Sequence, residues 1–398
     1  MRKPSRNLAL YVALGLVALE TWRISRIPVP VEDEAVHRRY ENTIEDIDTE
    51  DGITLRLKRY PNSGATPVIL ANGFTSNMYT WDLPWSDANL AVYLRECGYD
   101  VWIANFRGCG REPYLSDSGS GRYSVDHQAA LDIPALINGV TETTGRLPVW
   151  IGHSMGGISL YMYLQGVRVI PEDGDSKTIC DRRLAEERNR SLLGGITIGS
   201  PSTFQLEAHQ PFGPFQHSSF VHVAVKGSII ILRRVEGMFP RFTLVRRLGD
   251  LFGRFPRLGK AICLSPLDFF KFLNGFNPDN IDRDVEWSVY RLATDNMPTG
   301  VVIHGFRVLA DGGNLVDYHR EYDYHANMHI ITTPLLFITG TRDVPEGVRG
   351  SYEAVSSARK EYVNHPGYGH IDMVIGKRAK EEIWPGIREW INRMEAED

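Results

Sequence analysis

Ser154 lies in a segment whose residue types suit a nucleophile. The sequence around it reads WIGHSMGG (150–157), a G-x-S-x-G pattern in which Gly152 and Gly156 stand two residues to either side. The apolar run at 147–151 predicts a strand, and the apolar spacing after Gly156 predicts a helix. A sharp turn from strand to helix strains the serine backbone and leaves room only for small neighbours. The pattern therefore predicts a catalytic serine; the alternative is a glycine-rich turn with an idle serine.

A serine nucleophile needs a base to accept its proton and an acid to orient that base. A buried strand predicted at 335–339 is followed by a loop that carries Asp343. A second strand, predicted at 361–364, is followed by a glycine-rich loop that carries His370. Both residues come just after the carboxyl ends of strands, where open α/β sheets place their sites. With the chain order serine, acid, histidine, we predict Ser154 as nucleophile, Asp343 as orienting acid and His370 as base.

Three other titratable residues lie close to these positions in the sequence. Glu207 follows an apolar strand predicted at 195–198 and is a rival for the role of the acid. Asp372 is interpreted as a hydrogen-bonding residue of the histidine loop. His153 is interpreted as a packing neighbour, because its side chain reaches the hydroxyl of the adjacent serine poorly.

Acyl transfer also needs N–H groups that stabilise the oxyanion formed on the substrate. One donor is expected from the residue after the nucleophile, which is Met155. The other is expected from the loop after an earlier strand, and we assign it to Phe74, because the strand predicted at 68–71 leaves the sheet through Gly73. Both donors are backbone groups, so the identity of the two side chains matters mainly through packing.

Apolar runs alternate with helical patterns along the chain. An early hairpin is predicted around the Asp51-Gly52 turn, and a helix is predicted at 89–98, which ends at a glycine. Such alternation predicts an α/β fold with a mostly parallel central sheet and helices on both faces. We expect this core to comprise residues 40–201 and 331–398.

A long insertion separates the two parts of the predicted core. Ser154 and Asp343 are 189 residues apart, against roughly a hundred in a minimal hydrolase of this type. Twelve of the sixteen phenylalanines fall within 204–276. We therefore predict a helical cap insertion at 202–330 with an apolar acyl pocket beneath it; the alternative is that these rings only build the core of the cap.

Residues 226–260 are strongly basic and also apolar. They contain nine lysines or arginines against Glu236 and Asp250, a net charge of +7, with leucines, isoleucines and phenylalanines in between. This composition is typical of a helix pair that can lie on an anionic lipid surface. A solvated basic face is the alternative.

The N-terminus differs from the rest of the chain. Arg2, Lys3 and Arg6 precede an apolar run at 8–19, which is shorter than the span of about 20 residues that crosses a bilayer comfortably. The run fits a signal peptide without an obvious cleavage site, or an uncleaved anchor, and we assign 1–26 to such a segment. The protein is then expected to be membrane-associated or exported. An amphipathic helix on the body of a cytoplasmic protein is the alternative.

Composition excludes several classes of function. The chain has 398 residues and a net charge of −5, which gives no case for nucleic acid as a partner. Four widely spaced cysteines without a C-x-x-C motif predict packed thiols rather than a disulfide or zinc framework. Histidines and an aspartate gather at 319–329, but their spacing fits no standard ligand pattern. We expect no metal and no cofactor.

The ordered set of motifs resembles the acid lipase family, which includes the gastric and lysosomal lipases. The resemblance rests on TEDGITLRLKRYP, VILANGF, NLAVYLRECGYDVWIANFRG, DIPALI, GHSMGG, YDYHANMHIITTP and GYGHIDMVIG. It implies the α/β-hydrolase fold, with Ser154 as nucleophile, Asp343 as acid and His370 as base. The chain departs from the family at Asn72, where such lipases usually carry histidine. It is also distantly similar to polyhydroxyalkanoate synthases, but those use cysteine as nucleophile.

These observations together predict a serine carboxylic ester hydrolase, a lipase or esterase that cleaves lipid-like or apolar acyl esters through an acyl-enzyme on Ser154. Two alternatives remain open at this point. An acyltransferase would use the same three residues with an alcohol in place of water. A non-catalytic lipid-binding protein would keep the hydrolase scaffold without turnover.

Overall fold

A central sheet of eight strands organises the computed structural model, which describes residues 19, 22–29, 31–119, 122–172, 175–204, 228–233, 240–263, 275–311 and 313–397. The order across the sheet is β1-β2-β4-β3-β5-β8-β13-β14. The strands are β1 (Thr43–Asp48), β2 (Thr54–Tyr60), β3 (Pro67–Ala71), β4 (Asp100–Ala104), β5 (Val149–His153), β8 (Gly194–Ile198), β13 (Leu335–Gly340) and β14 (Lys360–His365). The β1–β2 and β2–β4 pairs are antiparallel and the others are parallel.

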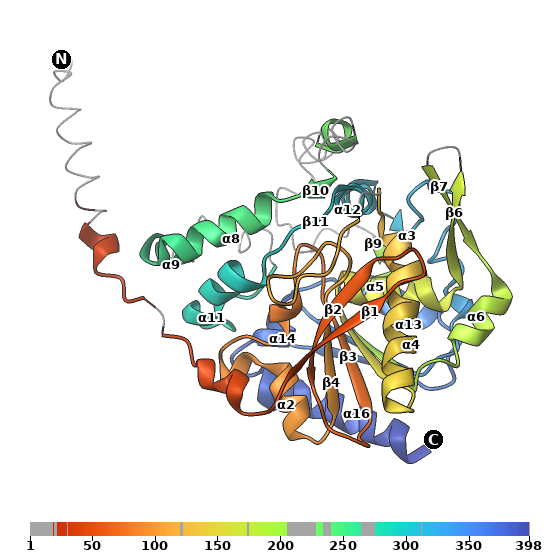
Figure 1. The fold of residues 1–398 in the computed structure, drawn as a ribbon, viewed down its shortest axis with the longest axis horizontal. Helices are drawn as coiled ribbons and strands as arrows, with labels where there is room; N and C mark the ends of the chain where they lie inside the picture. Colours follow the sequence, from red (N-terminus) through yellow and green to blue (C-terminus); the bar gives the residue numbers. More distant parts are fainter. Residues whose placement is uncertain are drawn as a thin grey trace.

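Alternate residues of the strands pack into two separate cores, one on each face of the sheet. Val68 and Leu70 of β3 pack in one core, and Ile69 and Ala71 pack in the other. Strands buried on both faces read as unbroken apolar runs, which is why the central strands could be recognised in the sequence. Helices cover both faces (Figure 1), as predicted. They include α2 (Leu90–Glu96), α4 (Ile133–Thr144), α5 (Met155–Leu164), α13 (Pro345–Ala354) and α16 (Trp384–Glu397).

The strand before Ser154 is shifted relative to its prediction. We expected it at 147–151, but β5 runs from Val149 to His153. Gly152 and His153 pair with β8 in register, so the strand continues to the residue before the serine. The early hairpin agrees with expectation: β1 pairs with β2, and Gly52 in the turn has φ +78°.

The described part of the insertion lies at one end of the sheet, in the upper part of Figure 1. Between residues 240 and 311 its elements are β10 (Arg241–Phe242), α8 (Leu244–Arg254), α9 (Pro256–Cys263), α11 (Arg283–Ser288), the π-helical η6 (Val289–Ala293), β11 (Met297–Pro298) and α12 (Thr299–Asp311). We call residues 240–311 the cap segment. Helices α8 and α9 correspond to the helix pair predicted from the basic stretch, although part of that stretch lies outside the described residues. The division of the chain at 202 and 330 stays a prediction.

A search of the described helices for one that is both long and apolar enough to span a membrane found none. The apolar run at 8–19 lies outside the described residues except for Leu19. All four cysteines are free thiols, as expected.

Candidate active site

Ser154 stands at the junction between β5 and α5, in a strained backbone conformation. Its φ of +53° and ψ of −117° lie in a region that residues with a side chain rarely adopt. The backbone N–H of Ser154 donates to the carbonyl of Ile198 at the end of β8, over 2.8 Å. This bond ties the turn to the neighbouring strand and helps to hold the strained serine in place.

The two glycines of the motif are required by close backbone contacts. A Cβ on Gly152 would stand 2.4 Å from the carbonyl carbon of Gly156. A Cβ on Gly156 would stand 2.3 Å from the carbonyl oxygen of Ala71 in β3. Both distances are shorter than real Cβ contacts, so the turn forms only with glycine at these positions. The idle-turn interpretation gives no reason for such crowding, whereas a sharp strand-to-helix elbow does.

Asp343 and His370 are brought together from the loops after β13 and β14. The Nδ1 of His370 lies 2.9 Å from the Oδ1 of Asp343, in hydrogen-bond contact. Asp343 is buried, whereas 29% of the His370 side chain is exposed. Burial alone lowers the pKa of His370, but the charge and hydrogen bond of Asp343 outweigh it and raise that pKa above its ordinary value of 6.5. The carboxylate therefore favours a protonated imidazole.

Gly199, which sequence reasoning missed, makes this pairing sterically feasible. It directly follows β8 and has φ +60°. A Cβ at Gly199 would stand 2.7 Å from the Oδ2 of Asp343 and 2.9 Å from the Nδ1 of His370. A glycine directly after a buried strand that neighbours the strand before Asp343 is the signal that could have identified it.

His153 connects the serine elbow to the histidine loop. Its Nε2 lies 3.1 Å from the carbonyl oxygen of His370 and donates to it, and the two imidazole rings have centroids 4.5 Å apart. Burial, assisted by the charge on His370, lowers the pKa of His153 to about 3. A neutral, buried imidazole suits a packing role, as predicted. Ser154 and His370 thus share a neighbour, although no hydrogen bond joins their side chains in the described chain. Such bonds often tighten only with substrate.

The loop after β3 lies against the serine. A Cβ on Gly73 would stand 3.0 Å from the Cβ of Ser154. The departure at Asn72 has a local explanation: its side chain is buried and its Nδ2 donates to the carbonyl of Ser76, which closes the loop. No hydrogen-bond partner for the backbone N–H of Phe74 or of Met155 is found within the described residues.

Of the two other acidic residues considered near these positions in the sequence, Asp372 and Glu207, only Asp372 lies within the described residues. Asp372 is buried and accepts hydrogen bonds from the backbone N–H groups of Gly369 and Asn277 and from the Nδ2 of Asn280. Burial raises the pKa of Asp372 despite these bonds. It therefore shapes the histidine loop, as expected, and does not contact the imidazole through a hydrogen bond. Glu207 lies outside the described residues.

The cap segment contacts the loop that carries Phe74 and the loop that carries His370. Gly305 of α12 packs against the ring of Phe74, whose centroid is 6.0 Å from that of Phe306. At the other end, the N–H of Ile371 donates to the carbonyl of Gly275 over 2.9 Å. The described part of the insertion therefore touches the site at these two loops.

A groove of about 1170 Å³ lies elsewhere, between the residues around α4 and the β6 (Val167–Glu172) and α6 (Arg182–Arg188) region. Ser154, Asp343 and His370 do not line it. Its walls mix arginines with carboxylates, and we assign no role to it.

A family model described as the alpha/beta hydrolase family matches residues 68–382, which is more than half of the chain. The chain belongs to the alpha/beta hydrolase family. The match begins at β3 and ends just before α16, so it includes Ser154, Asp343 and His370 together with the insertion.

Two human lipases are similar to this alpha/beta hydrolase in sequence. Lipase member K is 24% identical over 380 residues, which are 86% of this chain and 85% of that protein. Gastric triacylglycerol lipase is 33% identical over 131 residues, but these cover 29% of this chain and 33% of that protein. The resemblance to the acid lipases is thereby confirmed at low identity.

The fold of this alpha/beta hydrolase also matches a solved structure. A soluble variant of monoglyceride lipase from Saccharomyces cerevisiae, in complex with a substrate analogue, has a TM-score of 0.53 and 16% identity. That match covers 92% of this chain and 98% of the other. At this identity the match shows the fold alone, and it confirms the fold class predicted from the motifs.

Proposed function

We propose that this protein is a serine carboxylic ester hydrolase that acts on lipid-like or apolar acyl esters. The single observation that carries the proposal is the hydrogen-bonded Asp343–His370 pair, which lies with the strained serine elbow at the carboxyl ends of parallel strands of one sheet. The lipases among its relatives support the same assignment.

The reaction would proceed in two halves. His370 accepts the proton of the Ser154 hydroxyl as the oxygen attacks the ester carbonyl, and the backbone N–H groups of Phe74 and Met155 stabilise the oxyanion. The intermediate collapses, the carbon–oxygen bond to the alcohol breaks, and His370 gives its proton to the departing alcohol. Water then attacks the acyl-enzyme by the same route, which releases the acid and restores Ser154. Asp343 orients the imidazole and stabilises its charged form.

A fluorophosphonate probe tests the nucleophile, because it reacts covalently with an activated serine. We expect labelling at Ser154, and we expect Ser154→Ala to lose both the labelling and the hydrolysis of p-nitrophenyl esters. Ser357→Ala is a matched control, since Ser357 is also buried but precedes β14 at the opposite end of the strand. Labelling that persists in Ser154→Ala would refute the assignment. Product analysis with added alcohol separates hydrolysis from acyl transfer, and esters of increasing chain length define the acyl preference.

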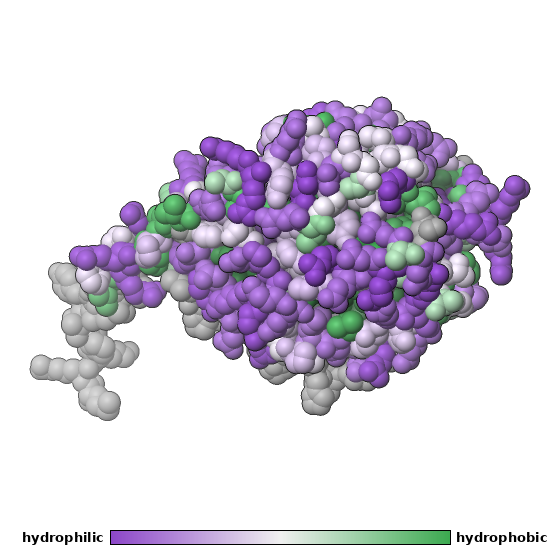
Figure 2. Space-filling view, turned by 90° about the horizontal axis from the view of Figure 1, so that it is seen from below, coloured by the Kyte–Doolittle hydropathy of each residue, from purple (hydrophilic) through white to green (hydrophobic). Residues whose placement is uncertain are grey.

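The exposed face of the cap segment favours a lipid surface as partner. An apolar stripe runs along α8 and α9, and its side chains have exposed fractions between 38% and 58%. It consists of Leu244, Leu248, Leu251, Phe255 between the two helices, Leu258 and Ile262. Arg247, Arg254 and Arg257 are exposed beside it. By contrast, the face in Figure 2 is mainly hydrophilic, with apolar residues in separate spots. An apolar stripe flanked by cations is the pattern of a helix that lies in a bilayer interface. We call these residues of α8 and α9 the docking stripe.

The same proposal places the protein at a membrane or in an exported compartment, through the segment 1–26. A chain that lacks residues 1–26 is expected to leave the membrane fraction and to keep its activity on soluble esters. Full-length protein that is already soluble and unprocessed would contradict this localisation.

A further inference from the structure

The loop that carries the N–H of Phe74 is tight and strained. Thr75 has φ +51°, which residues other than glycine adopt at a cost. The hydroxyl of Ser76 donates to the carbonyl of Gly73 over 3.0 Å, and Asn72 closes the loop from the other side. Such a conformation persists only where its surroundings hold it. We call residues 73–77 the oxyanion loop.

The cap segment supplies part of those surroundings. Ser76 and Thr294 form an isolated antiparallel bridge. The N–H of Asn77 donates to the carbonyl of Ala293 over 3.1 Å, and the N–H of Asp295 donates to the carbonyl of Thr75 over 2.9 Å. The residues after η6 therefore pair with the oxyanion loop as a short strand would, more than 200 residues away in the sequence.

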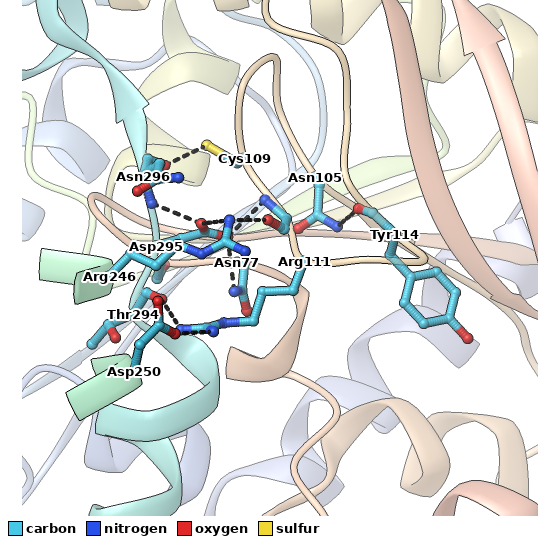
Figure 3. Close-up of polar contacts among 12 residues, drawn as sticks. Asn77, Asn105, Cys109, Arg111, Tyr114, Arg246, Asp250, Thr294, Asp295 and Asn296 are labelled. Carbon is cyan, nitrogen blue, oxygen red and sulfur yellow. Dashed lines mark hydrogen bonds and ion pairs between the residues drawn. The ribbon is translucent and has the colours of Figure 1, made fainter. Parts of the chain in front are cut away.

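The carboxylate of Asp295 lies at the centre of this junction (Figure 3). It is fully buried. Its Oδ2 accepts from the Nδ2 of Asn77 over 2.8 Å and from the N–H of Gly110 over 2.6 Å. Its Oδ1 accepts from the N–H of Asn296 over 2.7 Å and lies 3.4 Å from the Nη1 of Arg246 in α8. The same guanidinium donates to the carbonyl of Gly110 over 3.0 Å.

We propose that Asp295 is a positioning residue that holds the oxyanion loop in register with Ser154. This inference rests on the proposed function, since it concerns the loop that stabilises the oxyanion. Asp295 binds Asn77, the last residue of that loop, and Gly110 in the loop after β4, while Arg246 offsets part of its charge. One buried carboxylate thus ties three segments together: the oxyanion loop, the loop after β4 and helix α8. It touches none of the reacting atoms.

Replacing Asp295 with asparagine tests the carboxylate with little change in shape. The acid presents two oxygens to donors on both sides, and the amide replaces one of them with an NH₂ group. Whichever way the amide turns, its NH₂ group faces at least one N–H donor, and that donor then lacks an acceptor. The loop is then expected to shift away from the position that suits the oxyanion. Because displacing a donor costs less than the factor of about 10²–10³ lost on removing one, kcat for a soluble p-nitrophenyl ester should fall about 30-fold, with KM unchanged within about twofold.

A thionoester separates positioning from mere loss of folded protein. It carries sulfur in place of the carbonyl oxygen, and sulfur is larger and a weaker hydrogen-bond acceptor, so its turnover depends less on the N–H donors. In Asp295→Asn, the ratio of kcat/KM for the p-nitrophenyl ester to that for its thiono counterpart should fall about tenfold. Titration with a fluorophosphonate counts the active molecules of each variant. A ratio equal to that of the wild type would overturn the proposal and leave Asp295 a purely structural residue.

Two further variants sharpen the test. Asp250→Asn is the matched control, because Asp250 of α8 pairs with Arg111 at the same junction but does not contact the oxyanion loop; its ratio should equal that of the wild type. Arg246→Met keeps the apolar stem and removes the cation, so it should lower the ratio in the same direction, by about threefold. If Asp295→Asn does not fold, Arg246→Met decides: an unchanged ratio refutes the positioning role. Failure of the proposed function is distinguishable, because the wild type would then show no labelling at Ser154.

Discussion

The central sheet and the cap segment place their residues under different constraints. In the sheet, Ser154 and Asp343 follow buried strands and His370 follows the partly exposed edge strand β14, and close contacts at Gly152, Gly156 and Gly199 leave little freedom. In the cap segment, α8 and α9 expose the docking stripe to solvent. The sheet therefore constrains the positions of the candidate residues, whereas the cap segment exposes an apolar surface to solvent. They meet where Asp295 joins the oxyanion loop to α8.

The largest effect is expected from Asp343→Asn, which tests the sheet. Loss of the carboxylate removes the group that orients His370 and stabilises its charged form, and a change of this kind typically lowers kcat by about 10⁴. It also removes the main charge that raises the pKa of His370, so that burial, opposed only by the smaller effect of Asp372, lowers that pKa. Because only neutral His370 accepts a proton, the acid limb of the kcat/KM profile should move to lower pH. Stopped-flow hydrolysis across pH measures both effects.

Asp372→Asn is the matched control for this variant. Asp372 is also buried in the histidine loop, but its carboxylate binds backbone and amide donors around Asn277 and Asn280. Its replacement should lower the melting temperature, whereas kcat should fall far less than in Asp343→Asn. If Glu207→Gln produced the large loss and Asp343→Asn did not, the acid would have to be reassigned to Glu207.

A smaller effect is expected from Gly199→Ala. The added methyl group meets Asp343 and His370 at less than 3 Å, and the backbone there has φ +60°. The pair must move apart, and a displacement of about 1 Å in a catalytic group can cost about 100-fold in rate. Kinetics after active-site titration measure the loss. Gly386→Ala in α16 has open space around its Cβ and should leave kcat unchanged; equal kcat values in the two variants would refute the steric argument.

The sequence predicted the pairing of Asp343 with His370 and the strand-to-helix turn at Ser154, because local patterns determine these features. Buried strands such as β3 and β13 appear as apolar runs, and Ser154, Asp343 and His370 each come after a strand of the sheet. The end of β5 was misplaced by two residues, since Gly152 and His153 are weak strand formers that the neighbouring β8 holds in register. The tertiary context decides such boundaries.

The contacts of the cap segment were not predictable from the sequence. Asp295 meets Asn77 across 218 residues and Gly110 across 185, and no local pattern distinguishes it from other aspartates. The basic stretch was recognised, but its members differ: Arg247 is exposed, whereas Arg246 contacts Asp295 and Lys260 pairs with Asp284. Charge counted along the sequence therefore overstates the charge that is available to a lipid surface.

The smallest effect tests that surface. Arg254 is exposed at the end of α8, beside Leu251 and Phe255 of the docking stripe. A cation close to an anionic membrane contributes about 1 kcal/mol, which corresponds to about fivefold in affinity. Arg254→Gln should therefore weaken binding to anionic vesicles about fivefold at low salt, as measured by co-sedimentation. The difference should shrink as salt rises, because the Debye length falls to about 8 Å near physiological ionic strength.

Arg393→Gln is the matched control, since it removes the same charge from α16, away from the cap segment, where Arg393 pairs with Glu361. Both variants should hydrolyse a short soluble ester at the wild-type rate, because neither residue contacts the loops that carry Ser154, Asp343 and His370. The comparison between the two arginines cancels any contribution of the N-terminal segment, which both variants retain. Equal binding of the two variants to anionic vesicles would make the stripe on α8 and α9 an ordinary solvated face, and the proposed lipid contact would then have to come from another part of the chain.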